Sequence, residues 1–360
     1  MEFGLSQEQI ALQDSVNRFL DEKIPLERVR KYAENTEDNG LDIWSGLTEL
    51  GIPALLIPEE YGGVGLGSLE AAIVAECLGR RTTPGPFLST AILATKALIL
   101  AGSEKQKELF LPKIADGSLI VAAAISETTG ARRNAGISCK NNELTGRSLF
   151  AMDIENAQHI LVVDRDNRLY FVERDARGVD ITILPQVDRT RSLAEITYTK
   201  APCELLASSE NSNIVSQVVD LGRVIIAADS LGASQEMLDQ AVAYAMQREQ
   251  FNRVIASFQA VKHLCAEMAA EVEPSRSLVW YAAHALEDLP EEAHLMACHT
   301  KAHLAEVGQF VGKTSTMVHG GMGFTDLLGL HYWFKRLGYN RQILGSPESI
   351  REDAAVAQGL

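Results

Sequence analysis

The stretch "REQFNRVIASFQAVKHLCAEM" (residues 248–268) joins two long helical segments and decides how the last third of the chain folds. Arg248 stands at the end of the first predicted helix, the chain turns after Phe251, and Gln259 begins the next helix. An arginine at a helix end can bind a pyrophosphate through its planar fork of donors. Phe251 can pack on a flat ring system, and Gln259 can hydrogen-bond a nucleotide. The alternative is a plain helical hairpin with a surface arginine and a core phenylalanine.

The segments on either side of this hairpin predict three domains. Long amphipathic segments at residues 212–247, 256–287, 291–318 and 329–344 predict an antiparallel helical bundle. Before them, short β-branched segments are broken by the turn sequences "NNELTG" and "DRDNRL", which favours a mostly antiparallel β domain. The first 115 or so residues read as helices, beginning with a capping box in "SQEQ". We therefore predict an α+β, mainly α chain with an N-terminal helical domain (1–116), a middle β domain (117–211) and a C-terminal four-helix bundle (212–360).

Composition excludes several classes of protein. The chain has 360 residues and a formal net charge of -15, so it does not attract nucleic acid or an anionic membrane surface non-specifically. It contains no apolar run long enough to span a bilayer, and its acidic, amphipathic start is not a signal peptide. Five widely spaced cysteines without CxxC spacing indicate free thiols in a reducing cytoplasm. Because His299 and His303 lie one helical turn apart without a further ligand in sight, we predict no metal site.

Two glycine-rich stretches are further candidates for turns that approach a ligand. In "HGGMGFT" (319–325), Gly320 and Gly321 break a helix and let backbone N–H groups approach a phosphate or an adenine edge. The alternative is a glycine cap between two helices of the bundle. The second stretch, "PEEYGG" (58–63), permits a tight turn but lacks the pattern of a Rossmann phosphate loop.

Taken together and in this order, "PEEYGG" (58–63), "REQFNRVIASFQAVKH" (248–263), "HGGMGFT" (319–325) and "KRLGYNRQILG" (335–345) resemble the acyl-CoA dehydrogenase family. The resemblance covers nearly the whole chain. It implies FAD between the β domain and the bundle, bound partly by a neighbouring subunit of a tetramer. It also implies α,β-dehydrogenation of an acyl-CoA substrate, in which a carboxylate removes the α-proton and the β-hydride goes to FAD. An electron-transfer flavoprotein would then take the electrons.

The resemblance also implies roles for single residues. Arg248 matches a position that meets FAD across a subunit boundary, and Arg223 matches one associated with CoA binding. The other positions implied at the cofactor are Ser126, Phe150 (as the aromatic wall in "RSLFAMD"), Phe251, Gln259, Gly320 and Gly321.

The carboxylate base is where the sequence departs from the family. The commonest family position for a Glu is Leu344 here, and a second family position, on the first bundle helix, is Gly222. Asp229 lies seven residues after Gly222, so at 3.6 residues per turn both share one helix face. Burial in "RVIIAADSLG" (223–232) would raise its pKa towards that of a base, which makes Asp229 the candidate base. The alternative is that Asp229 pairs with a buried arginine. Glu348 is a weaker candidate in an exposed helix start.

Three hypotheses for function follow. The first is a self-sufficient FAD-dependent acyl-CoA dehydrogenase with Asp229 as base, acting on a branched, cyclic or steroid-derived acyl group. The second is a catalytically defective partner subunit of a heterotetramer with a second acyl-CoA dehydrogenase chain, which the altered loop "SETTGARRNAG" (126–136), Met317 and Leu344 favour. A third is a relative that uses the same fold for oxygen chemistry on a flavin.

Overall fold

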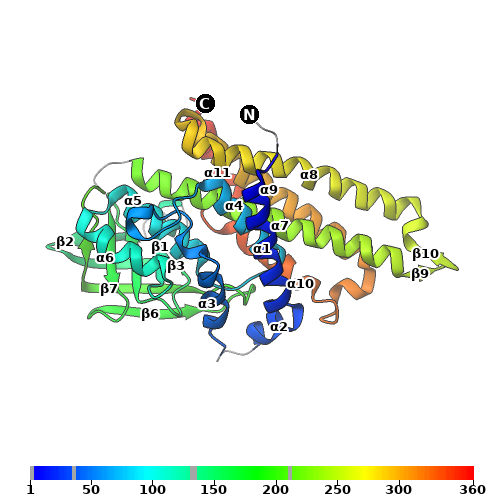
Figure 1. The fold of residues 1–360 in the computed structure, drawn as a ribbon, viewed down its shortest axis with the longest axis horizontal. Helices are drawn as coiled ribbons and strands as arrows, with labels where there is room; N and C mark the ends of the chain where they lie inside the picture. The colour runs from blue at the N-terminus through cyan, green and yellow to red at the C-terminus, as the bar shows by residue number, and fades with distance from the viewer. Residues whose placement is uncertain (1–3, 35–37, 130–135, 210–212) are drawn as a thin grey trace.

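The computed structural model describes residues 4–34, 38–129, 136–209 and 213–360. Helices precede a β sheet, and longer helices follow it, so the predicted mainly α, α+β order is confirmed (Figure 1). The sheet lies at one end of the molecule, and the long helices extend away from it to the opposite end (Figure 1). The predicted domain boundary at 116/117 stays a prediction, and the one at 211/212 falls outside the described residues.

The N-terminal part is helical, as predicted. Its first helix begins with the expected capping box, in which the Ser6 Oγ accepts from the Gln9 N–H and the Ser6 N–H donates to Gln9 Oε1. One segment differs from the expected α-helix: residues Phe87–Ala94 form a π-helix. This conformation is rare in proteins as a whole, and where it does occur it is often at a functional site. The α-helices are α1 (Gln7–Lys23), α2 (Leu26–Glu34), α3 (Leu41–Glu49), α4 (Ser68–Arg80), α5 (Thr95–Ala101) and α6 (Glu104–Ala115).

The sheet has eight strands and is mostly antiparallel, as predicted; β1 and β4 form its one parallel pair among the described residues. Both predicted hairpins form, β2–β3 around "NNELTG" and β4–β5 around "DRDNRL". Asn141 and Asn142 turn the first with φ of 53° and 57°, a conformation that asparagine tolerates. The strands are β1 (Val121–Ala124), β2 (Gly136–Lys140), β3 (Glu143–Met152), β4 (His159–Val163), β5 (Leu169–Glu173), β6 (Val179–Leu184), β7 (Leu193–Pro202) and β8 (Glu204–Leu205).

The C-terminal helices follow the predicted segments within a few residues. They are α7 (Asn213–Gln247), α8 (Gln259–Asp288), α9 (Pro290–His319), α10 (Leu330–Gln342) and α11 (Pro347–Ala357). The turn between α7 and α8 contains a small hairpin of β9 (Glu249–Gln250) and β10 (Arg253–Val254), at the end of the molecule farthest from the sheet (Figure 1).

Helix α7 is buried along most of its length because α9, α4 and α8 pack against it, and α4 approaches it closely. Glycines make the close approach possible: a Cβ on Gly79 would overlap the carbonyl of Asp229, and one on Gly232 would overlap that of Glu76. This crossing removes the Asp229 region from solvent. All five cysteines are free thiols, as expected. Among the described helices, none has the length and the hydropathy needed to cross a membrane.

Candidate active-site cavity

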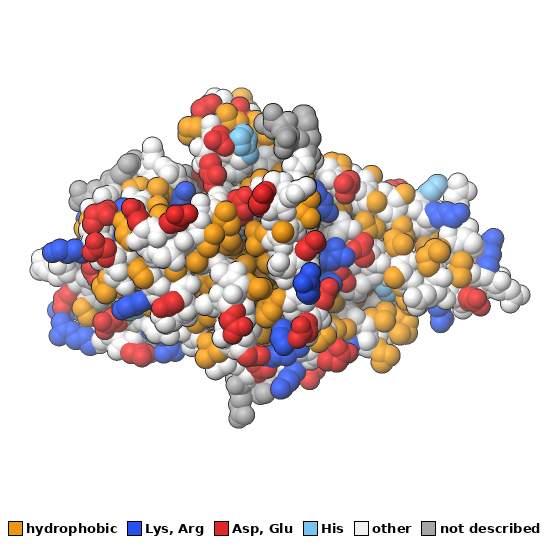
Figure 2. Space-filling view, viewed as in Figure 1, with side chains coloured by type: hydrophobic (Ala, Val, Ile, Leu, Met, Phe, Trp, Pro, Cys, Tyr) orange, Lys and Arg blue, Asp and Glu red, His pale blue; other side chains and the backbone are white. Residues whose placement is uncertain are grey.

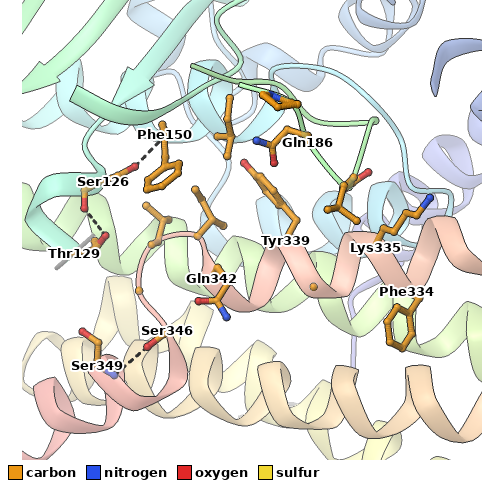
Figure 3. A pocket seen from close by; sticks show the side chains of 18 residues that line it. Ser126, Thr129, Phe150, Gln186, Phe334, Lys335, Tyr339, Gln342, Ser346 and Ser349 are labelled. Atoms are coloured by element: carbon orange, nitrogen blue, oxygen red, sulfur yellow. Dashed lines mark hydrogen bonds between the residues drawn. The ribbon is translucent and has the colours of Figure 1, made fainter. Parts of the chain in front are cut away.

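A cavity of about 760 Å³ lies between the sheet and α10, within the size range of small-molecule sites. Ser126, Phe150 and the loop of residues 185–188 form one wall of it, and α10 with the turn that follows it forms the other. Figure 3 shows Phe150 and Tyr339 facing the same space from these two sides. The structure therefore brings together Ser126 and Phe150, two of the residues predicted to contact a cofactor.

Phe150 reaches the cavity because strand β3 is irregular beside it. The pairing of β3 with β7 shifts register between Ser148 and Ala151, and Phe150 has φ of 56°. The Ser126 Oγ donates a hydrogen bond to the Phe150 carbonyl at 3.1 Å, which holds this backbone in place. Phe150 stays 38% exposed, so its ring is available to an occupant of the cavity. Strained backbone of this kind clusters at ligand sites.

Gly222 and Leu344, the two positions that the sequence resemblance assigns to a carboxylate base, face each other. A Cβ built on Gly222 would lie 2.6 Å from the Leu344 Cδ1 and 2.8 Å from the Leu93 Cδ2. Leu344 lines the cavity but is only 1% exposed, and its backbone has φ of 57°. Hydrocarbon therefore fills the space between these positions. Among the described lining residues, the one carboxylate is Asp188, which the Arg336 Nε contacts at 2.8 Å.

Asp229 is 4% exposed and does not line this cavity. Its Oδ2 accepts from Arg336 Nη1 at 3.0 Å and from Arg191 Nη2 at 3.1 Å. Its Oδ1 accepts from Asn340 Nδ2 at 2.7 Å. These contacts fit the alternative in which Asp229 pairs with buried arginines. Its role as base stays a prediction, and the geometry does not favour it.

Arg336, which sequence reasoning missed, lies at the centre of this buried ion network. It is fully buried, and besides its two carboxylates it donates to the Thr83 carbonyl and to Thr190 Oγ1. Burial opposes its charge, but Asp229 and Asp188 outweigh that effect and raise the pKa of Arg336. The sequence could have indicated this network, because Arg336 and Asn340 are four residues apart and therefore share one face of α10.

Arg223 also lies inside the bundle. Its Nε donates to the Leu344 carbonyl at 3.2 Å, and its Nη2 lies 2.7 Å from the Asp353 carboxylate. Since it is buried and does not line the cavity, these contacts do not support the predicted role in CoA binding. They instead hold the turn that carries Leu344.

Five other predicted cofactor residues lie away from this cavity, at the β9–β10 tip and in the turn after α9. Arg248 and Phe251 belong to the β9–β10 turn, and Gln259 begins α8 (Figure 1). Gly320 follows α9, whose last residue, His319, packs its ring 4.7 Å from that of Tyr244 near the end of α7. All five predicted residues, Arg248, Phe251, Gln259, Gly320 and Gly321, are exposed. One chain therefore does not bring them to its own cavity.

Two remaining candidates can also be placed. Glu348 is exposed in the first turn of α11, as expected, and its carboxylate pairs with Arg341 rather than lining the cavity. Asp220, His294 and Cys298 form a cluster that was not predicted, with ligand atoms within 4.8 Å of one another. The Arg223 Nη1 lies 3.2 Å from Cys298 Sγ and 3.6 Å from Asp220, so a guanidinium already supplies positive charge there. We assign no metal to this cluster.

Comparisons with known proteins agree with this architecture. Residues 6–118 match the family profile described as "Acyl-CoA dehydrogenase, N-terminal domain", and residues 212–358 match "Acyl-CoA dehydrogenase, C-terminal domain". The chain is 26% identical to the acyl-CoA dehydrogenase IpdE2 of Mycolicibacterium smegmatis, over 95% of this chain and 96% of that protein.

Solved structures show the same fold. A structure described as "Tcur3481-Tcur3483 steroid ACAD" superposes with a TM-score of 0.89 at 25% identity, covering 98% of each chain. The ChsE4-ChsE5 complex from Mycobacterium tuberculosis superposes with a TM-score of 0.91 at 24% identity, covering 100% of this chain and 99% of that one. With both family profiles matched and the fold shared, the chain belongs to the acyl-CoA dehydrogenase family, oxidoreductases that act on CH–CH bonds.

Proposed function

We propose that this chain is one subunit of a hetero-oligomeric, FAD-dependent acyl-CoA dehydrogenase and that another chain supplies the catalytic carboxylate. The observation that carries the proposal is the contact between Gly222 and Leu344, which leaves hydrocarbon at both family positions for the base. Leucine and glycine side chains cannot accept the α-proton of an acyl thioester. Asp229, the remaining candidate, is held by Arg336, Arg191 and Asn340.

The cavity fits the isoalloxazine ring of FAD. Phe150 offers an exposed aromatic face, and most of the remaining walls are apolar. Ser126, Gln186 and Tyr339 add a few polar groups that can orient a flat heterocycle. FAD, when bound, would accept the hydride from the β-carbon of the substrate. This chain's contribution is then to hold the ring between the sheet and α10 and to exclude water around it.

Arg248, Phe251 and Gln259 support binding of a second FAD, in the cavity of a neighbouring subunit. They lie at the far end of α7 and α8 from their own cavity (Figure 1). No hydrogen bond or ion pair joins the Arg248 side chain to any residue that the structure describes. Its donors are therefore free to bind a pyrophosphate.

The tip of α7 and α8 also exposes apolar side chains of the kind found at protein–protein interfaces. Figure 2 shows apolar side chains exposed among basic ones around the tip of α7 and α8. The exposed apolar residues there, in the last turn of α9 and in the segment that follows α9 are Val242, Met246, Phe251, Met317, Phe324 and Leu327. Since a monomer rarely exposes so many large apolar side chains together, we propose that a second family chain covers them.

The acyl group is proposed to be bulky, with a steroid-derived group favoured. The support is the likeness to the structure described as a steroid ACAD, at 25% identity. We propose an electron-transfer flavoprotein as the electron acceptor, because a dehydrogenase must pass two electrons on after each turnover.

The test compares this chain purified alone with the same chain co-expressed with a second acyl-CoA dehydrogenase chain. The readouts are the ratio of FAD to polypeptide and the bleaching of flavin absorbance by a steroid-derived acyl-CoA. We expect bleaching only when both chains are present. Stoichiometric FAD with full bleaching by this chain alone would overturn the proposal and return attention to Asp229 as the base.

A further inference from the structure

Tyr339 separates the cavity of about 760 Å³ from the buried ion network. Its side chain lines that cavity together with Phe150 and Gln186. It also lines a much smaller cavity, of about 10 Å³, on the side of Ile226 and Asp229. Figure 3 shows the Tyr339 ring rising from α10 towards the loop that carries Gln186. A single side chain therefore forms the wall between the candidate cofactor space and the Asp229 contacts.

The hydroxyl of Tyr339 is available to an occupant of the cavity. No hydrogen bond joins it to any residue within the described ranges, although charged groups surround it. The two nearby arginines have other partners: Arg336 pairs with Asp188 and Asp229, and Arg191 donates to the Gly85 carbonyl and to Asp229. Because the phenol donates to no acceptor among the described residues, it can donate its one hydrogen bond to an occupant.

The surroundings also keep this hydroxyl protonated. Burial raises the pKa of Tyr339 far above its ordinary value, and the Asp153 carboxylate nearby acts in the same direction. At any pH in the working range of a protein, Tyr339 is thus a neutral O–H donor. A donor of this kind favours an acceptor atom that gains negative charge.

We propose that Tyr339 is a positioning residue for the flavin ring and donates a hydrogen bond from its hydroxyl to a ring acceptor atom of bound FAD. This inference rests on the proposed function, since it takes FAD as the occupant of the cavity. Phe150 and Tyr339 then hold the ring from the sheet side and from the α10 side. A hydrogen bond to the ring stabilises the reduced, more negative flavin, so it raises the reduction potential of the cofactor.

The variant Tyr339→Phe tests this because it removes the hydroxyl and keeps the ring that divides the two cavities. The control is Tyr332→Phe, which removes a hydroxyl from the same face of α10 two turns earlier, outside this cavity. Both variants are compared with the unaltered chain in the assembly that retains FAD. The readouts are the FAD dissociation constant, the visible flavin spectrum and the reduction potential.

We expect Tyr339→Phe to weaken FAD binding by about fivefold to tenfold, the effect of one net hydrogen bond. We also expect a shifted flavin absorption band and a lower reduction potential, with Tyr332→Phe unchanged in all three readouts. A Tyr339→Phe protein with unaltered affinity, spectrum and potential would overturn the role of Tyr339 alone. Failure of the unaltered assembly to bind FAD at all would instead overturn the proposed function, and this inference with it.

Discussion

Leu344 occupies the space that the missing side chain of Gly222 leaves open: a Cβ on Gly222 would lie 2.6 Å from the Leu344 Cδ1. The two residues come from α7 and from the turn after α10, more than a hundred positions apart in the sequence. The sequence resemblance assigns the base to one or other of these positions. Here the leucine side chain at 344 fits only because residue 222 is a glycine. A carboxylate cannot be restored at residue 222 without moving Leu344 and Leu93.

The first prediction concerns Gly222→Ala. The added methyl would force the ends of the buried Leu344 and Leu93 side chains to shift. Overpacking of a core costs about 1–3 kcal/mol, partly offset by about 1 kcal/mol of better helix propensity. We expect a net loss in the free energy of unfolding, measured by urea denaturation of the flavin-free chain. Gly338→Ala on α10 is the control, since nothing lies within 4 Å of its Cβ, and it should stabilise the chain. A Gly222→Ala chain that gains as much stability as the control would contradict the close contact.

The second prediction separates the two interpretations of Asp229. If Asp229 is mainly a partner of Arg336 and Arg191, Asp229→Asn leaves buried arginines short of negative charge and costs about 3 kcal/mol or more in unfolding free energy. The exposed pair of Asp326 with His331 provides the control variant Asp326→Asn, with an expected cost of at most about 1 kcal/mol. If Asp229 were a base without structural partners, Asp229→Asn would unfold at the same urea concentration as the unaltered chain.

Asp229 also shows how far the sequence alone could lead. An acidic residue within an apolar helical stretch predicts a buried carboxylate, and the two outcomes, a base or an ion pair, follow from physical chemistry. Which one occurs depends on Arg191 and Arg336, which lie 38 and 107 positions away along the chain. Local periodicity carries no information about such distant partners. The same limit hid Tyr339 and Gln186, which become neighbours only when α10 packs beside the sheet.

The sequence predicted well those helices and hairpins that depend on residues close together along the chain. The four long helices and both hairpins depend on apolar periodicity and on turn residues close to each other in the sequence. The π-helix at Phe87–Ala94 was missed because its apolar residues fit an ordinary buried helix equally well. For the cofactor residues, the family resemblance supplied the set, and only the fold showed that its members lie in separate places, some at the cavity between the sheet and α10 and some at the tip of α7 and α8 (Figure 1).

The third prediction concerns pH. Hydrogen bonds to Asp220 and then to Cys298 outweigh burial and raise the pKa of His294 to about 10, from an ordinary value near 6.5. Because the folded state holds this proton more tightly, its stabilising contribution is complete below about pH 6.5 and disappears as the pH rises towards 10. Asp220 accepts from His294 Nδ1 at 2.9 Å, and Arg223 also lies beside Asp220.

The variant His294→Gln checks this expectation. Its unfolding free energy should fall below that of the unaltered chain at pH 6, and the gap should close between pH 6.5 and 10. The His294 side chain is 40% exposed, so solvent screening keeps the effect modest. Asp220→Asn should remove most of the same pH dependence because it removes the partner. A stability gap that stays constant from pH 6 to 10 would show that the pair does not titrate as proposed.

The last prediction asks which flavin Arg248 serves. Arg248→Ala removes an exposed side chain at the tip of α7 and α8, so the unfolding free energy of this chain should change by no more than about 0.5 kcal/mol. Loss of a charge-assisted contact to a phosphate should weaken FAD binding about tenfold to a hundredfold in the assembly. Lys262→Ala, an exposed cation three residues into α8, is the control and should leave FAD binding unchanged.

The flavin that Arg248→Ala weakens shows whether Arg248 serves the partner's cavity or this chain's own cavity. In an assembly of two unlike chains, Arg248→Ala should weaken the flavin held in the partner's cavity, while Tyr339→Phe should perturb the flavin in this chain's own cavity. Combined in one chain, the two substitutions should therefore affect two separate flavins, and their effects on binding should add without coupling. If both substitutions weakened the same flavin and were strongly coupled, the tip of α7 and the cavity beside α10 would have to meet. One chain folded as in Figure 1 keeps the tip apart from its own cavity, so that outcome would require a different pairing of subunits.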